Sequence, residues 1–216
     1  MSIVPVKTPS VVKKMFPNYV WSISTSEPVI YLTFDDGPTP EITEWVLHQL
    51  NEFNARATFF CIGNNVSKHA NIFKQITENG HAVGNHTHNH LRGWKTKTKK
   101  YIENVNQANA VLESQLQATN LFRPPYGHIK PKQAKQLVSK GYKIIMWDVL
   151  SFDWDEQTNN KTCLENVIKN TSTGSIIVFH DSIKASNNLK FTLPRVLEFF
   201  TKKGYSFKAL NIKDIP

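Results

Sequence analysis

The chain has 216 residues, of which 40% are hydrophobic and 20% charged, so it is long enough for one domain with one sizeable core and is not disordered. Its apolar runs are short and interrupted by charge, which excludes a transmembrane span. Lys and Arg outnumber Asp and Glu by 26 to 17, a net charge of +9. Because no nucleic-acid-binding motif accompanies this charge, we expect no nucleic-acid partner.

Residues 1–28 contain four prolines and show little periodicity. They predict an arm that packs on the body of the protein through apolar side chains, namely Met15, Phe16, Tyr19, Val20 and Trp21. No basic start followed by an apolar segment is present, so no secretory signal is visible. The compartment stays open between the cytoplasm and export with a trimmed signal.

Strand-like and helix-like segments alternate from Val29 onward, which predicts one domain over residues 29–216. Short apolar runs predict strands at 29–34, 57–62, 81–85, 121–123, 142–148, 175–180 and 206–210. Amphipathic segments predict helices at 40–50, 66–79, 96–117, 131–140, 163–170 and 191–203. Repeated strand–helix units indicate parallel strands with helices outside, in an α/β fold. Seven units fit a closed or nearly closed barrel better than an open sheet, although spacing alone does not exclude the latter.

The first of these strands ends in two adjacent carboxylates, Asp35 and Asp36, followed by Gly37-Pro38. Side chains alternate along a strand, so the two carboxylates should leave it in different directions. One could then hold a cation while its neighbour faces a substrate as a base. The competing interpretation is that Asp-Asp-Gly-Pro is only a turn sequence.

Three histidines, His86, His88 and His90, lie within five positions after the third strand. His86 and His90 are four apart, which places them on one face if the segment turns helically. Two imidazoles and one carboxylate, with positions left open for water, form a catalytic zinc arrangement. We expect His88 to lie outside this arrangement or at the surface.

A strand-end cation precedes a stiff diproline in Arg123-Pro-Pro-Tyr126-Gly. The prolines fix the backbone, so the loop can aim the Tyr126 N–H at a developing oxyanion. An ordinary turn with a surface arginine would have the same sequence.

Carboxylates and indoles follow the fifth strand in Trp147-Asp-Val-Leu-Ser-Phe-Asp153-Trp154, a combination that suits carbohydrate. Trp154 is the better candidate for a groove wall, whereas Trp147 is expected in the core. His180 ends the sixth strand, where an imidazole can act as a general acid. Val178, two residues earlier on the same face, could line a small apolar pocket.

The reactive side chains all fall at or just after the C-terminal end of a strand. In parallel β/α barrels this end carries the active site. Their common placement therefore predicts one site rather than several unrelated turns.

These five stretches together resemble the polysaccharide deacetylases, the NodB-homology domain of carbohydrate esterase family 4, from about Val29 to Leu210. The segments that carry the resemblance are Thr33–Gly37, His86–His90, Arg123–Tyr126, Ser151–Trp154 and Val178–His180. The resemblance implies the family's distorted (β/α)₇ barrel. It also implies a metal-dependent hydrolase that removes N-acetyl groups from peptidoglycan or chitooligosaccharide and releases acetate.

The resemblance also implies a role for each site residue. Asp35 would be the base, His180 the acid, and Asp36, His86 and His90 the metal ligands. Arg123 would brace the base, and Asp153 would orient charged catalytic partners, either Arg123 or His180. Tyr126 would supply the oxyanion donor from its backbone, Trp154 a groove wall, and Val178 part of the acetate-methyl pocket.

Two positions depart from the family pattern: Leu150 stands where members often carry Asp or Asn, and Val178 replaces the usual Leu. We expect them to affect substrate preference rather than activity. Zn²⁺ is the expected metal, with Co²⁺, Ni²⁺ and Mn²⁺ as alternatives for such a ligand set. We expect a monomer that binds an N-acetylated glycan. Three alternatives stay open: a hydrolase of another C–N bond, a non-catalytic glycan-binding domain and a basic nucleic-acid-binding protein.

Overall fold

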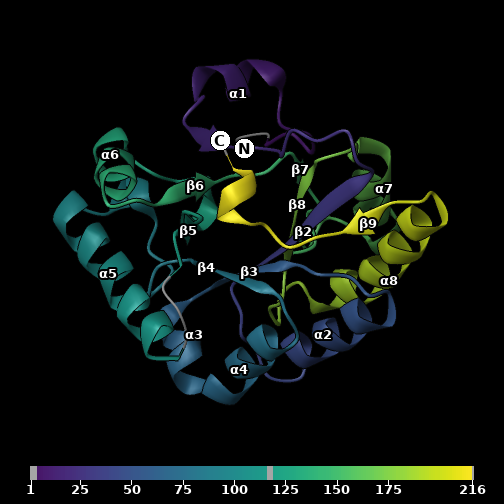
Figure 1. Ribbon diagram of the computed structural model, residues 1–216, viewed down its shortest axis with the longest axis horizontal. Helices are drawn as coiled ribbons and strands as arrows, with labels where there is room; N and C mark the ends of the chain where they lie inside the picture. The colour runs from purple at the N-terminus through teal and green to yellow at the C-terminus, as the bar shows by residue number, and fades with distance from the viewer. Residues whose placement is uncertain (1–3, 116–118, 216) are drawn as a thin grey trace.

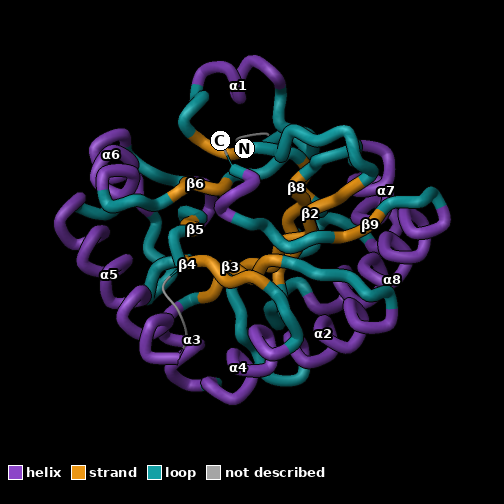
Figure 2. The backbone as a smooth tube through the Cα atoms, in the orientation of Figure 1, coloured by secondary structure: helices purple, strands orange, loops and turns teal. Residues whose placement is uncertain are grey.

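A parallel sheet forms the centre of the protein in the computed structural model, which describes residues 4–115 and 119–215. The sheet order is β1-β6-β5-β4-β3-β2-β8-β7, and β9 pairs with β2. Every pair of these strands that is hydrogen-bonded runs parallel within the described residues. The strands curl into a half-barrel surrounded by helices, which confirms the predicted fold class (Figures 1 and 2).

The strands are short apart from β2, which runs through the middle of the sheet. Their bounds are β1 Tyr19–Val20, β2 Val29–Asp35, β3 Thr58–Cys61, β4 Ala82–Asn85, β5 Leu121–Phe122, β6 Lys143–Ile145, β7 Val149–Leu150, β8 Ile176–His180 and β9 Ser206–Phe207. All seven residues of β2 are buried, as expected for a parallel strand covered on both faces. Its apolar sequence is therefore explained by its position.

The helices cover the outside of the sheet (Figure 1). Their bounds are α1 Ser10–Met15, α2 Ile42–Glu52, α3 Gly63–Lys68, α4 Ala70–Glu78, α5 Thr98–Gln115, α6 Pro131–Ser139, α7 Asn160–Asn170 and α8 Ser186–Lys202, with 3₁₀ turns η1 Gly93–Lys95, η2 Pro125–Gly127 and η3 Ile212–Asp214. The predicted helix 96–117 extends into residues 116 and 117, which lie outside the described part of the chain.

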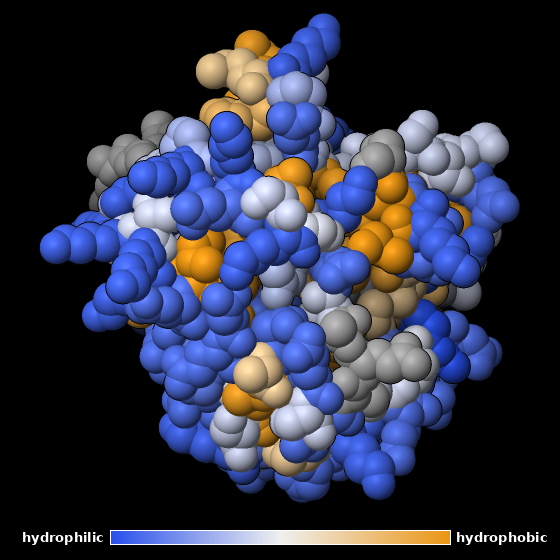
Figure 3. Space-filling view, turned by 60° about the vertical axis from the view of Figure 1, so that its left-hand side comes forward, coloured by the Kyte–Doolittle hydropathy of each residue, from blue (hydrophilic) through white to orange (hydrophobic). Residues whose placement is uncertain are grey.

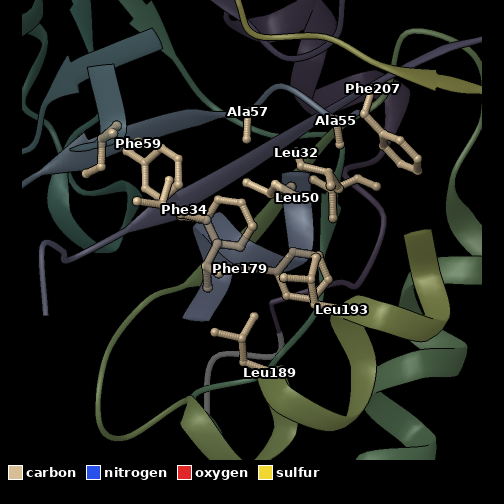
Figure 4. Packing of buried hydrophobic residues seen from close by; sticks show 14 of the residues in the cluster. Leu32, Phe34, Leu50, Ala55, Ala57, Phe59, Phe179, Leu189, Leu193 and Phe207 are labelled. Atoms are coloured by element: carbon tan, nitrogen blue, oxygen red, sulfur yellow. The ribbon is translucent and has the colours of Figure 1, made fainter. Parts of the chain in front are cut away.

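Aromatic rings from three neighbouring strands form the middle of the main core (Figure 4). The Phe34 ring lies 5.0 Å from the Phe59 ring and 6.0 Å from the Phe179 ring, centroid to centroid. Leu50 of α2 and Leu193 of α8 belong to the same buried cluster. Helices on the outside therefore hold the strands whose ends carry the polar residues.

The predicted strand 142–148 is divided, because the chain changes partners within it. The Met146 N–H donates to the Val20 carbonyl of β1, whereas the Asp148 N–H donates to the Ile176 carbonyl of β8. The segment thus crosses from one end of the sheet order to the other and forms β6 and β7 on either side. Sequence periodicity gives no sign of this change.

The N-terminal arm contains a helix and a strand, although its sequence predicted neither. β1 extends the sheet by pairing with β6, and the Leu150 N–H donates to the Val6 carbonyl. Val20 and Trp21 are buried as predicted, but Met15 is 67% exposed, so the prediction that it packs was wrong. Phe16 is also exposed, although its ring stacks on that of Tyr19.

Hydrophilic side chains dominate the surface that Figure 3 brings forward, with small hydrophobic areas between them. Within residues 4–115 and 119–215, no helix combines the length and apolar character needed to cross a bilayer.

Candidate active site

A cavity of about 500 Å³ opens at the C-terminal ends of the central strands. It contains the carboxylates of Asp35 and Asp36 and the imidazoles of His86, His90 and His180. The register brings two of them together directly, because Asp35 of β2 is paired with His180 of β8. The other lining residues are Val4, Tyr126, Gly127, His128, Trp147, Leu150, Trp154, Val178, Ser182 and Lys184.

Three of these side chains form a cluster suited to a metal ion: Asp36, His86 and His90. The Asp36 Oδ1 atom lies 3.2 Å from Nε2 of His90 and 3.8 Å from Nε2 of His86. That oxygen is buried, and no described residue gives it a hydrogen bond. A buried carboxylate oxygen without a partner costs free energy, so a cation between these atoms fits the observed geometry.

Both imidazoles are suited to donate a lone pair to a metal. Burial lowers the pKa of His86, and burial together with His86 lowers the pKa of His90 to about 4. The His86 Nδ1 atom lies 2.7 Å from the Arg123 carbonyl oxygen, which orients the ring with Nε2 toward Asp36. A backbone partner on the second nitrogen is the usual support of a metal-binding histidine.

The histidine loop brings its two ligands together without the helical turn that the spacing suggested. Thr87 and His90 both have positive φ, 65° and 52°, and the segment is irregular. The Asn104 side chain accepts hydrogen bonds from the backbone N–H groups of His88 and Asn89. The tight turn, rather than an i, i+4 face, places the His86 and His90 rings 5.1 Å apart, and His88 lies outside the cluster.

Asp35 is paired with a fully buried arginine. The Arg123 Nη1 atom donates to Asp35 Oδ1 at 2.7 Å and to the Thr33 hydroxyl at 2.7 Å. Burial alone would raise the pKa of Asp35, but Arg123, His86 and His180 together hold it below its usual value. The carboxylate therefore stays ionised at neutral pH.

His180 is held by Asp153 through two hydrogen bonds. Asp153 Oδ1 lies 2.8 Å from His180 Nδ1, and Asp153 Oδ2 accepts the His180 backbone N–H at 2.7 Å. Burial would lower the pKa of His180, but Asp153 outweighs it and raises the pKa to about 9. Of the two partners that the sequence left open for Asp153, the structure places His180 against it.

Aromatic side chains stand on two sides of the cavity. The Tyr126 ring lies 4.6 Å from that of His90, and Tyr126 has a φ of +61° between Pro125 and Gly127. The Trp154 ring packs with its edge against His180 at 4.7 Å. Trp147, expected in the core, is only partly buried and also lines the cavity.

The two residues that depart from the family pattern are neighbours. Leu150 of β7 is paired with Val178 of β8 in the sheet register, and both line the cavity while nearly fully buried. They form a continuous apolar floor beside His180.

Several supporting residues escaped sequence reasoning, since their role depends on long-range contacts. Asp181 Oδ1 accepts the Gly37 N–H at 3.0 Å, and its other oxygen accepts the Thr43 hydroxyl. A Cβ on Gly37 would lie 1.9 Å from that carboxylate, so only glycine allows this approach. The Asn65 amide donates to the Asp36 carbonyl at 2.8 Å. The Asp181 and Asn65 side chains together fix the Asp-Asp-Gly turn. In the sequence, only Gly37 indicates this turn.

Comparison with known proteins gives consistent matches. The family model described as polysaccharide deacetylase matches residues 22–145, more than half of the chain. A peptidoglycan-N-acetylglucosamine deacetylase from Bacillus cereus is 31% identical over 197 residues, which cover 88% of this chain and 90% of that protein. The peptidoglycan-N-acetylmuramic acid deacetylase PdaC from Bacillus subtilis is 30% identical over 88% of this chain, which spans only 39% of PdaC.

Solved structures agree with these sequence matches. The crystal structure of the Bc1960 peptidoglycan N-acetylglucosamine deacetylase superposes with a TM-score of 0.86 at 31% identity, over 94% of this chain and 95% of that one. The structure of PdaC superposes with a TM-score of 0.78 at 28% identity, over 87% of this chain and 90% of that one. With the five sequence stretches gathered around one cavity, these matches show that the chain belongs to the polysaccharide deacetylase family.

Proposed function

We propose that the chain is a metal-dependent hydrolase that removes N-acetyl groups from N-acetylglucosamine-type glycans, either peptidoglycan or chitooligosaccharide, and releases acetate. The observation that carries the proposal is the presence of the Asp36–His86–His90 cluster, an ionised Asp35 and a protonated His180 in one cavity. The two relatives named above are deacetylases of peptidoglycan, which supports a glycan substrate.

Asp36, His86 and His90 are the proposed ligands of the ion, with Zn²⁺ preferred and Co²⁺, Ni²⁺ or Mn²⁺ as alternatives. Such an ion, when bound, supplies Lewis-acid polarisation and lowers the pKa of water. Asp35 is the proposed base, because Arg123 keeps it ionised while its second oxygen stays available to take a proton from the attacking water. The Tyr126 backbone N–H is the proposed donor to the oxyanion.

His180 is the proposed acid for the leaving amine. Asp153 occupies Nδ1, so Nε2 is the nitrogen left to donate a proton as the C–N bond breaks. Water adds its oxygen to the acetyl carbon, and the nitrogen leaves with the proton from His180. The products are acetate and a free amino sugar. Trp154 and Val178 would contact the sugar and the acetyl methyl group, respectively.

Acetate release from a panel of substrates tests this function. The panel should contain peptidoglycan, N-acetylglucosamine oligomers and simple amides, each assayed with and without a chelator. We expect release from at least one glycan, loss of release with the chelator and recovery when Zn²⁺ is added back. Release only from the simple amides would instead favour a hydrolase of another C–N bond, and tight, salt-dependent binding of DNA would favour a nucleic-acid-binding protein.

A further inference from the structure

A second group of aromatic rings continues from the metal cluster along one side of the cavity. The His90 ring lies 4.6 Å from Tyr126, which lies 6.0 Å from His128, and His128 stacks flat on Trp94 at 3.8 Å. His128 lines the cavity, whereas Trp94 is 59% exposed beyond it. We call Tyr126, His128 and Trp94 the aromatic shelf.

The outer end of the shelf is held rigidly. The Trp94 indole N–H donates to the Ile129 carbonyl at 3.2 Å, which fixes the ring against the loop that carries His128. The fully buried Gln133 amide donates to the carbonyls of Gly93 and Thr96. A Cβ on Gly93 would lie 2.2 Å from the His128 carbonyl oxygen, so glycine lets the two loops touch.

The shelf also carries unused polar groups. The Arg92 guanidinium lies 4.2 Å above the Tyr126 ring and gives no hydrogen bond to another described residue. The His128 Nδ1 atom is buried, and no residue within the described ranges is its partner. A rigid, exposed indole beside the Arg92 guanidinium matches a ligand with an apolar face and polar edges.

We propose that the aromatic shelf binds a second sugar ring of the glycan chain, beyond the sugar whose acetamide lies at the metal cluster. A pyranose presents C–H bonds on its face and hydroxyls at its edge, so it can pack on the face of Trp94 that His128 does not cover while Arg92 meets an edge oxygen. This inference rests on the proposed function, because it assumes a glycan in the cavity. It makes the protein selective for chains over single sugars.

Turnover as a function of chain length tests the shelf. The variants are Trp94→Ala, Trp94→Phe, which keeps a ring, and Phe16→Ala, which removes a similarly exposed ring from the N-terminal arm. With the glycan series that the protein deacetylates, we expect Trp94→Ala to lower kcat/KM about fivefold on long oligomers, mainly through KM, and to leave the shortest substrate unchanged. Trp94→Phe should recover part of the loss, and Phe16→Ala should match the wild type at every length.

If Trp94→Ala loses the same factor in kcat/KM at every oligomer length, or loses none at any length, the aromatic shelf does not bind a second sugar. Thermal unfolding of each variant separates a loss of fold from a loss of binding. Titration calorimetry of N-acetylglucosamine oligomers into Asp35→Asn and into Asp35→Asn/Trp94→Ala gives a readout without turnover, in which only the first should gain affinity with length. If the wild type releases no acetate from any glycan, the proposed function fails, whereas this titration still decides whether the shelf binds sugar.

Discussion

Asp35 and Asp36 are adjacent in the chain, yet they lie in different surroundings. Asp35 faces a buried guanidinium, and Asp36 faces two imidazoles. The strand ends between them, and Asp36 has a φ of +83°, so the backbone itself turns one carboxylate away from the other. Two chemically identical side chains can therefore serve different functions, because their surroundings differ.

Replacing Asp35 by Asn tests the first of these tasks. An amide cannot take a proton from water, so we expect kcat to fall by about 10²–10⁴-fold. The three proposed ligands are untouched, so the variant should still bind one Zn²⁺, as measured by atomic absorption after dialysis. Near-normal turnover would assign the base to another group.

Replacing Asp153 by Asn tests the acid. Asp153 holds the pKa of His180 at about 9, so the rate should fall as pH rises through that value and the proton is lost. Without the negative charge the pKa of His180 falls, and the alkaline limb of the pH–rate profile should move to lower pH by about one unit or more. The acid limb serves as the internal control. If neither limb of the pH–rate profile moves, Asp153 does not control the pKa of His180.

At the scale of elements, the N-terminal arm connects the two ends of the sheet. Its Lys7 and Lys13 side chains both reach the buried carboxylate of Asp148, at 3.2 and 2.6 Å, and the Ser175 hydroxyl donates to the same group. Asp148 lies in the segment where the chain leaves β6 for β7. One side chain thus joins the arm, the crossing segment and the residue that precedes β8.

Asp148→Ala should destabilise the protein by about 1.5–3 kcal/mol, as expected for loss of hydrogen bonds to a charged group, measured by urea unfolding. Burial would raise the pKa of Asp148, but Lys13, Ser175 and Lys7 hold it below its usual value. The stabilisation is therefore fully present above about pH 4 and is lost as pH falls through the lower folded value. The variant should lose this part of the acid dependence. Exposed Lys208→Ala is the control, and an equal effect there would contradict the assignment.

The elements were predictable from the sequence to the extent that their patterns are local. The apolar runs of β2 and β8 and the glycine after α4 carry their own signals, so these two strands and the end of α4 were predicted within a few residues. The single helix predicted at 66–79 was wrong, because the chain divides there into α3 and α4 at His69. The arm's strand β1 and the division at Met146–Asp148 were not, because they depend on which distant strand offers a carbonyl. The site followed the same rule. The carboxylates, imidazoles and arginine of the five stretches could be picked out from the sequence, whereas Asn65, Asn104 and Asp181 act only through distant contacts.

At the scale of the whole molecule, a metal ion would join segments far apart in the chain. Asp36 follows β2, and His86 and His90 follow β4, so an ion held by all three binds only the folded state. Such binding stabilises the protein by about 2.7 kcal/mol when free metal is 100 times its Kd.

Zinc should therefore raise the Tm of the chelator-treated wild type by several degrees, as measured by calorimetry. His90→Ala should remove most of this shift, and His88→Ala, which changes a histidine outside the cluster, should leave it intact. If His88→Ala loses the zinc-induced shift in Tm and His90→Ala keeps it, the ligands are not those of the proposed cluster.

The register of β2 and β8 fixes the backbones of two residues that line the cavity. Asp35 and His180 are opposite each other in a parallel ladder, so the sheet holds their backbones at the spacing of adjacent strands, about 4.8 Å. Loops around the opening of the cavity can lengthen, shorten or change sequence without altering the spacing of β2 and β8. New substrate preferences in this architecture can thus evolve at the rim while the sheet keeps these two residues paired.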